Sequence, residues 1–213
     1  MEKALLIPPL NGAYLKTTQE NWVDVVKEFG VKGELTPQRW EPFYTHGQEI
    51  STTFSLAYFK SHLFVYFRVE EDEIRAHHKN HGDPVYEDSC VEIFIQGGDG
   101  RYVNFETNPN GALLANIGFD RHGRLELNPL FFDELAIFPR IINDFEWETL
   151  LILPLHHTPL LQEADTLEGM KLKGNLYKCG DLLKKPHYLA WAEVETSSPD
   201  FHRPEYFKDF LFL

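Results

Sequence analysis

Cysteine is scarce in this sequence, and glycosylation signals are absent. The 213 residues include two cysteines, Cys90 and Cys179, and no Asn-X-Ser/Thr site. Two cysteines exclude the disulfide framework of a small secreted scaffold, and a chain of this length can bury a sizeable core without one. Both fall in segments expected to be strands, so a disulfide between them stays an open alternative. We favour free thiols, because reducing compartments rarely hold structural disulfides.

The chain also lacks an excess of positive charge. It carries 20 Lys and Arg against 33 Asp and Glu, a formal net charge of −13. A chain of this charge repels nucleic-acid phosphates and anionic membrane surfaces. We therefore expect no nucleic-acid partner and no membrane partner, and a ligand that is neutral or cationic.

Long hydrophobic runs are missing. No segment approaches the roughly 18 apolar residues of a membrane helix, and the apolar run at residues 4–9 is too short for a secretion signal. The sequence as written therefore predicts a cytoplasmic protein. A secreted or periplasmic location is the alternative if a leader has been removed.

Several catalytic signatures are absent as well. The sequence has no G-x-S-x-G elbow, no H-E-x-x-H helix, no Walker loop and no C-x-x-C pair. Their absence makes an enzyme less expected without excluding one.

What the sequence does contain is a dense β pattern at residues 83–118. Apolar and polar side chains alternate along residues 90–96 and again along 102–107, which is the two-residue period of a half-buried strand. The turns GGDG (97–100) and NPNG (108–111) supply the glycines that tight connections need. This stretch is predicted to be a three-strand antiparallel meander whose polar face carries Glu92, Glu106 and Tyr102.

The rest of the chain continues this pattern. Hairpins are predicted over residues 51–70 and 136–153, and strands over 173–179, 187–192 and 209–213. About nine to eleven short strands with almost no long helix indicate an all-β fold, an antiparallel β-sandwich of the immunoglobulin or jelly-roll type. We find no internal repeat or low-complexity linker, so residues 1–213 are predicted to form a single domain.

Residues 1–48 are the hardest part to interpret. They are expected to form an N-terminal extension packed on the sandwich, with short helical or irregular structure. A short amphipathic helix is predicted over residues 19–29, ending at Gly30. Its inward face would carry Trp22, Val25, Val26 and Phe29.

Three features suggest a metal or haem. The histidines of residues 77–81 (HHKNH) could converge on one ion, but no cysteine or carboxylate sits beside them at ligand spacing, so we favour a polar loop. The acidic loops 70–73 and 83–88 could supply oxygen ligands to a structural Ca²⁺, without matching the twelve-residue calcium loop. A haem ligated by Met170 has little support. No cofactor is assigned beyond this optional calcium.

Glu92 and Glu106 are expected on adjacent strands and on the same face. A glycoside hydrolase uses such a pair of carboxylates, separated by about 5 Å or by about 6.5–9.5 Å. The alternatives are hydrogen-bond acceptors for a polyhydroxyl ligand and solvated residues of the sheet. The spacing in the sequence does not decide between these three.

Four blocks of the sequence, in order, resemble the family nine carbohydrate-binding modules, a β-sandwich group related to the sugar-binding domains called DOMON. The blocks are YEDSCVEIF (86–94), NLYKCGD (175–181), YLAW (188–191) and PDFHRPEYF (199–207). The resemblance extends from about residue 50 to the C-terminus. It implies that two aromatic rings clamp a sugar, and it places them at Tyr86 and Phe201. Where this chain has Tyr and Phe, the xylan- and cellulose-binding members have tryptophan.

The resemblance also implies polar partners for the sugar. The acidic strand residue of the family falls on Glu92, a sugar-binding arginine falls on Glu106, and a glutamine falls on Tyr177. The substitutions at Glu106 and Tyr177 set this chain apart from members that bind the reducing ends of glucans.

Three functions follow as hypotheses. The first is non-catalytic binding of a mono- or oligosaccharide by Tyr86, Glu92, Glu106, Tyr177 and Phe201, in support of polysaccharide catabolism and in association with a glycoside hydrolase. The second is a glycoside hydrolase that uses Glu92 and Glu106. The third is an interaction sandwich without a ligand.

Overall fold

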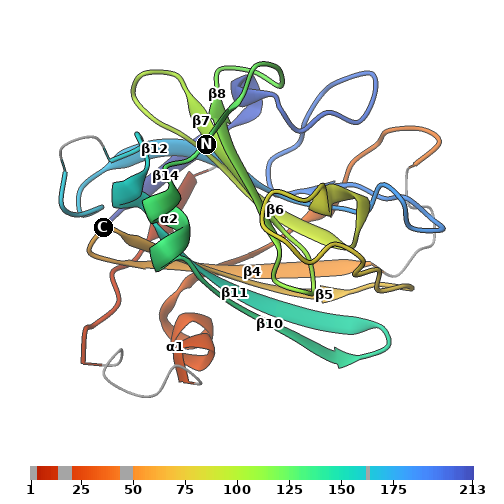
Figure 1. The fold of residues 1–213 in the computed structure, drawn as a ribbon, viewed down its shortest axis with the longest axis horizontal. Coiled ribbons are helices and arrows are strands. Elements are labelled where there is room, and N and C mark those ends of the chain that lie inside the picture. The colour runs from red at the N-terminus through yellow and green to blue at the C-terminus, as the bar shows by residue number, and fades with distance from the viewer. Residues whose placement is uncertain (1–3, 14–20, 44–49, 162–163) are drawn as a thin grey trace.

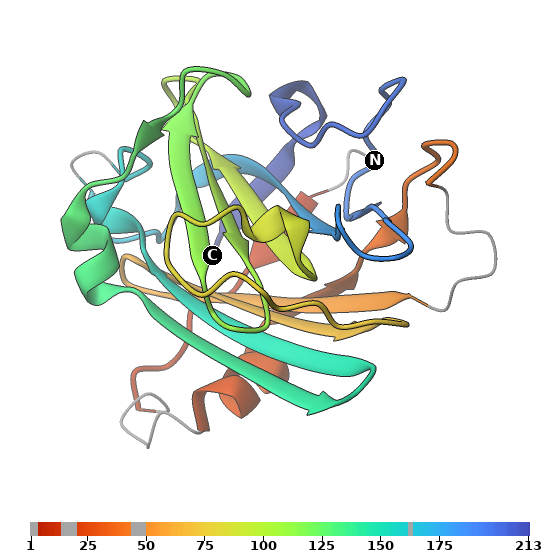
Figure 2. The ribbon, with the colours of Figure 1, turned by 45° about the vertical axis from the view of Figure 1, so that its right-hand side comes forward.

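Two β-sheets stacked face to face carry most of the chain (Figures 1 and 2). The structure is a computed structural model and describes residues 4–13, 21–43, 50–161 and 164–213. In chain order the elements are β1 (Ala4–Ile7), α1 (Trp22–Phe29), β2 (Val31–Glu34), β3 (Thr36–Pro37), β4 (Ser51–Phe59), β5 (His62–Glu70), η3 (Val85–Glu87), β6 (Cys90–Gln96), β7 (Tyr102–Thr107), β8 (Leu113–Gly118), β9 (Leu125–Glu126), α2 (Pro129–Glu134), β10 (Ala136–Asn143), β11 (Glu146–Pro154), η4 (Leu155–His157), β12 (Lys171–Cys179), β13 (Leu189–Ala190), η5 (Pro204–Tyr206) and β14 (Lys208–Phe212).

The larger sheet has nine strands and the smaller has five. The larger runs in the order β1-β14-β12-β6-β7-β8-β9, with β13 and β3 paired beside β12, and the smaller runs β10-β11-β5-β4-β2. The long pairings are antiparallel, whereas β1 pairs with β14 in parallel. The prediction of a mostly β sandwich of two sheets is confirmed.

Alternation along each strand separates the core from the outer faces. Val91, Ile93 and Ile95 of β6 point into the space between the sheets, where they join the main hydrophobic core. The intervening residues of the same strand point to the outer face of the larger sheet, where Phe94 belongs to a second apolar cluster with Tyr102 and Tyr177. The outer face of the larger sheet therefore also carries a packed cluster of buried apolar side chains.

The N-terminal residues are part of the sandwich rather than an addition to it. β1 lies beside the C-terminal strand β14 in the larger sheet, and β2 pairs with β4 at the edge of the smaller sheet. The expected extension thus supplies strands to both sheets.

The predicted helix is present and faces partly outward, and the first two residues of the predicted range, 19 and 20, lie outside the described residues. α1 lies on the outer side of the smaller sheet (Figure 1), where Val26 is fully buried against a cluster that includes Phe64 and Leu150. Trp22 packs edge-on against Phe64. Phe29 is 40% exposed, so its predicted inward position is wrong, because the helix ends there and the chain turns away into β2.

A buried ion pair joins the two sheets. Lys178 of β12 and Glu71, the residue after β5, place Nζ and Oε2 2.9 Å apart, and both side chains are fully buried. The indole nitrogen of Trp147 on β11 donates to the other carboxylate oxygen at 2.6 Å. Lys178 Nζ also lies 2.8 Å from Nε2 of His187, which is itself 3.5 Å from Glu71 Oε2. Burial, followed by the nearby Lys178 charge, lowers the pKa of His187 to about 2, so this ring is neutral and accepts.

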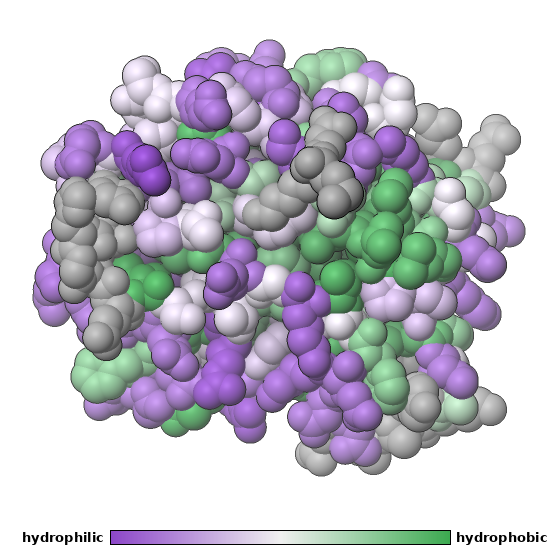
Figure 3. Space-filling model, turned by 180° about the vertical axis from the view of Figure 1, so that it is seen from behind, coloured by the Kyte–Doolittle hydropathy of each residue, from purple (hydrophilic) through white to green (hydrophobic). Residues whose placement is uncertain are grey.

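The outer surface is mixed in character. None of the helices among the described residues is both long and apolar enough to cross a membrane. Seen from behind, the molecule shows hydrophilic side chains over most of that face and a group of hydrophobic ones towards one side (Figure 3).

Replacing Lys178 by Met should lower the free energy of unfolding by about 3–5 kcal/mol, because Glu71 is left as an uncompensated buried charge. Urea denaturation measures the change. The matched control is Lys185→Met, which removes an exposed ion pair with Asp72 and should cost no more than about 1 kcal/mol. Equal effects for the two variants would contradict a structural role for the buried pair.

Candidate functional site

An open cleft of about 270 Å³ lies on the outer face of the larger sheet. Its floor is made by outward side chains of three neighbouring strands. Its walls come from η3, from the turn after β8, and from the two loops that follow β12 and β13. The residues used below are, for the floor, Glu92, Asn104, Glu106, Leu114 and Asn116, and, for the walls, Tyr86, Arg121, Arg124, Tyr188, Phe201 and His202.

Two glutamates sit side by side on this floor. Glu92 of β6 and Glu106 of β7 are direct partners in the antiparallel register, which places their Cβ atoms about 4.5–5.5 Å apart. Both are buried. Asn104, two residues before Glu106 on the same face, donates from Nδ2 to Glu106 Oε1 at 2.8 Å. The sequence therefore predicted correctly that these two glutamates are neighbours.

Arg124 fastens the floor to the turn after β8. Its guanidinium donates to Asn104 Oδ1, at 2.6 Å from Nη2, and to the carbonyls of Tyr102, Asn116 and Asp120. The same group lies over the Tyr102 ring, 4.2 Å from its centroid. Gly118 leaves the room for it, since a Cβ there would come within 3.2 Å of Arg124 Cγ. Arg124, Asn104 and Glu106 thus form one hydrogen-bonded chain along the floor.

Phe201 lines the cleft, but part of its ring is already in use. It stacks on Tyr177 with ring centroids 4.1 Å apart and planes at 12°, and it is 8% exposed. Trp40 supports it from another side at 5.5 Å. Tyr177 is fully buried, lies behind Phe201 rather than on the cleft wall, and donates its hydroxyl to the Phe201 carbonyl at 3.3 Å. The structure therefore gives Tyr177 no direct access to a ligand in the cleft.

Tyr86 is the more open of the two predicted rings. It lies in η3, just before β6, and is 39% exposed. Its carbonyl accepts from the amide of Asp181 at 3.0 Å, which ties η3 to the loop after β12. Tyr86 and Phe201 line the same cleft.

Burial controls the charge of the two glutamates. It raises the pKa of Glu106 to about 7, opposed by the Asn104 hydrogen bond. The pKa of Glu92 is also raised well above its usual range, first by burial and then by the carboxylate of Glu106. The pair therefore carries at least one proton near neutral pH, so a carboxylic acid is present that both donates and accepts hydrogen bonds.

The two cysteines meet beneath the cleft. Cys90 and Cys179 are opposite each other in the register of β6 and β12, and both are buried, free thiols. Cys179 donates from Sγ to Glu92 Oε1 at 3.0 Å. Ligand atoms of Cys90, Glu92 and Cys179 lie within 4.8 Å of one another, a set that zinc can use. Burial raises the pKa of Cys90 to about 12, so in this structure the set forms a hydrogen-bonded group of neutral thiols.

The histidines of residues 77–81 do not converge. Nε2 of His78 pairs with Glu87 at 3.0 Å, whereas Nδ1 of His81 accepts from the Leu113 amide at 3.1 Å. His77 is exposed. The favoured interpretation, a polar loop, agrees with this arrangement.

The acidic loops considered for calcium are also engaged. Asp72 and Glu73 pair with Lys185 and Lys184, and Asp88 accepts from the amides of His77 and His78. Asp83 and Glu87 both approach His78. Among the residues that the structure describes, no three carboxylates of these loops bring ligand atoms within 4.8 Å of one another.

Several cleft residues were missed from the sequence. Asn104 had a usable signal, because it alternates onto the face that carries Glu106. Arg121 and Arg124 had none, since a turn between short strands shows no period. His202 bonds through Nδ1 to the Tyr102 hydroxyl at 2.8 Å, and burial lowers its pKa to about 4, so it is a neutral member of the wall.

Comparison with known proteins identifies the family of this sandwich. Residues 34–212 match the model of the family described as Carbohydrate-binding family 9. The chain belongs to carbohydrate-binding family 9. A search of curated proteins finds no match.

Solved structures agree with membership of family 9. A candidate carbohydrate-binding protein from Bacteroides uniformis ATCC 8492 superposes with a TM-score of 0.86 and 25% identity over 100% of both chains. A family 9 module from Caldicellulosiruptor kristjanssonii, solved with glucose, gives 0.63 and 10% identity over 99% of this chain and 96% of that chain. The same module with cellotriose gives 0.58 and 10%, over 99% and 93%. These two similarities show a shared fold.

The buried glutamates predict how the stability of this family 9 domain changes with pH. The pKa of Glu106 is higher in the folded chain than in the unfolded chain, so the folded state holds the proton more tightly. The free energy of unfolding should therefore fall as pH rises from about 5 to about 8, by up to about 3 kcal/mol from this group. Glu106→Gln should flatten the decline in urea denaturation.

Glu126→Gln, an exposed position on β9 of the same sheet, serves as the control and should keep the wild-type decline. A decline of wild-type steepness in Glu106→Gln would show that the buried carboxyl is not its source.

Proposed function

We propose that the cleft binds a mono- or oligosaccharide without cleaving it. The observation that carries this proposal is the composition of one small cleft, where the rings of Tyr86 and Phe201 stand over a floor of fixed polar groups. A pyranose has the complementary character, with an apolar C–H face for a ring and hydroxyls for the floor. Mixed surfaces of this kind are typical of small-ligand sites.

The floor suits neutral hydroxyl groups in particular. Glu106 and Asn104 are held in place by Arg124 before any ligand arrives, so little side-chain freedom is lost on binding. A proton on one carboxyl group of the Glu92 and Glu106 pair lets the pair donate one hydrogen bond and accept others, as a hydroxyl requires. Tyr177 acts through Phe201, which it holds against the cleft, and is a positioning residue.

The affinity should be weak. If the rings cover about 100 Å² of apolar sugar surface, the gain is about 2.5 kcal/mol, and association consumes part of the total. A dissociation constant between the millimolar range and tens of micromolar follows. Tyr86 and Phe201 offer smaller rings than tryptophan, and Phe201 is stacked on one face already.

The relatives supply the first probes. The module from Caldicellulosiruptor kristjanssonii binds glucose and cellotriose, so these two sugars start the panel, together with xylo-oligosaccharides. In the cell, the module would support polysaccharide catabolism in association with a glycoside hydrolase. The open cleft favours sugar binding over an interaction sandwich without a ligand.

A hydrolase is the second candidate, because two glutamates lie side by side under the cleft. Hydrolases of this kind separate the roles by environment, so that one carboxyl stays ionised while the other holds a proton. Here burial raises the pKa of both, so their environments do not set one apart as the ionised carboxylate. Binding is therefore the better supported function.

Tyr86→Ala should weaken sugar binding about tenfold, the equivalent of about 1.4 kcal/mol, because it removes the most open apolar surface of the cleft. Isothermal titration calorimetry with the best sugar of the panel measures the change. The control is Phe145→Ala, a 61% exposed ring in the turn between β10 and β11, which should leave affinity unchanged. Loss of binding in both variants, or in neither, would count against the cleft.

Neither the wild-type protein nor Glu92→Gln should release reducing sugar from the oligosaccharides of the panel. The chemistry of the pair favours binding without turnover, and a reducing-end assay decides. Turnover by the wild type that disappears in Glu92→Gln would replace the binding proposal with the hydrolase.

A further inference from the structure

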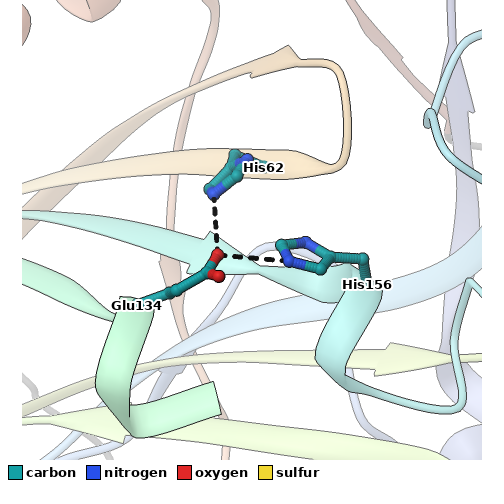
Figure 4. Close-up of side chains that lie close together, drawn as sticks. All are labelled: His62, Glu134 and His156. Atoms are coloured by element: carbon teal, nitrogen blue, oxygen red, sulfur yellow. Dashed lines mark ion pairs between the residues drawn. The ribbon is translucent and has the colours of Figure 1, made fainter. Parts of the chain in front are cut away.

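Three histidines and one glutamate gather at one end of the smaller sheet, in a cluster that shares no residue with the cleft. Figure 4 shows three of the four, His62, Glu134 and His156. The strand order explains the meeting. His62 begins β5 and is the register partner of Pro154, which ends β11. His156 and His157 follow in η4. Ala136 of β10 pairs with Ile152 of β11, so Glu134, two residues before β10, arrives at the same end.

The ligand atoms of the cluster are close. His156 Nε2 lies 3.1 Å and His62 Nε2 lies 3.8 Å from Glu134 Oε2. One atom each from His62, Glu134 and His156 lies within 4.8 Å of the other two. Figure 4 shows the two imidazoles pointing at one carboxylate from different directions. Atoms that bind a tetrahedral metal at 2.0–2.1 Å are about 3.3 Å apart, so these separations are already near those of a filled site.

Neighbouring groups hold the cluster in place. Nδ1 of His156 lies 3.0 Å from the Ser61 hydroxyl, which leaves Nε2 as the free nitrogen that faces Glu134. A hydrogen bond at the second ring nitrogen is the usual way in which a protein orients a metal-binding imidazole. His157 Nε2 lies 3.2 Å from the other carboxylate oxygen, Oε1, and orients Glu134 from behind.

Glu134 has no lysine or arginine partner among the described residues. Among the described residues, the positively charged or chargeable groups within ion-pair distance of it are all histidines. The carboxylate also stands in the last turn of α2, where the helix field disfavours a negative charge. A bound cation would pair with the carboxylate and offset the unfavourable helix field.

We propose that His62, His156 and Glu134 bind a first-row transition-metal ion of the Zn²⁺ class, with a fourth position open to water and with His157 and Ser61 as positioning residues. Two imidazoles and one carboxylate suit Zn²⁺, whereas Ca²⁺ takes six to eight oxygens. The site links α2, which connects the two sheets, to the ends of β5 and β11. Its role is therefore to clip the sheets together, independently of any sugar.

The test uses the full chain, stripped with chelator and titrated with Zn²⁺. Calorimetry should give one site per chain. The melting temperature should rise by about 5–10 °C at a hundredfold excess over the dissociation constant, and Ca²⁺ should leave it unchanged. Co²⁺ in place of Zn²⁺ should give the visible absorption of a low-coordinate site, a readout that does not depend on stability.

Three variants and one control assign the site. His156→Ala, His62→Ala and Glu134→Gln should each weaken Zn²⁺ binding at least tenfold and remove the Co²⁺ absorption, while their metal-free melting temperatures show that they fold. His77→Ala, an exposed histidine outside the cluster, should bind as the wild type does. Binding that survives in the double variant His62→Ala/His156→Ala, no Zn²⁺ binding by the wild type, or equal stabilisation by Ca²⁺ would each overturn the proposal.

Discussion

The buried ion pair between Lys178 and Glu71 determines which way the strand β12 faces. A lysine amine inside a sandwich is tolerable only with a partner at hand, and here it has Glu71 and His187. Because side chains alternate along a strand, an inward Lys178 sends Tyr177 and Cys179 outward. A shift of one residue in the register of β12 would turn the Lys178 ammonium to solvent and the Tyr177 ring, which supports Phe201, into the core. The cleft therefore depends on an interaction on the opposite face of the same strand.

The same alternation explains how much of the fold could be predicted. The long strands β4, β5, β6, β7 and the first part of β11 carry periods of two, and the structure places them, and β10 beside β11, close to the expected residues. The missed elements have no such signal. β9 has two residues, α2 has six, and β1 is paired in parallel with a strand at the opposite end of the chain. Partners so distant are chosen by packing, which a local pattern does not record.

The site shows the same division. Glu92 and Glu106 were placed correctly because a sheet face and a register follow from the pattern, whereas Tyr177 was expected at the ligand and lies behind Phe201. How far a side chain such as Tyr177 lies below the cleft surface depends on how the loop before η5 folds back over the sheet. The histidines make the point again. Neighbours in the sequence at 77–81 diverge, and His62, Glu134 and His156, up to 94 residues apart by their numbering, converge because three strand ends coincide.

The seat of Phe201 on Tyr177 has one more consequence. In the segment between β13 and β14, the part that lines the cleft contacts the sheet through this ring stack and the His202 bond to Tyr102, and Phe207 behind it packs on Phe94 and Tyr102. Because the part that lines the cleft is a surface loop, evolution, or an engineer, could lengthen or recompose it and obtain a new ligand preference while the strands beneath kept their shape.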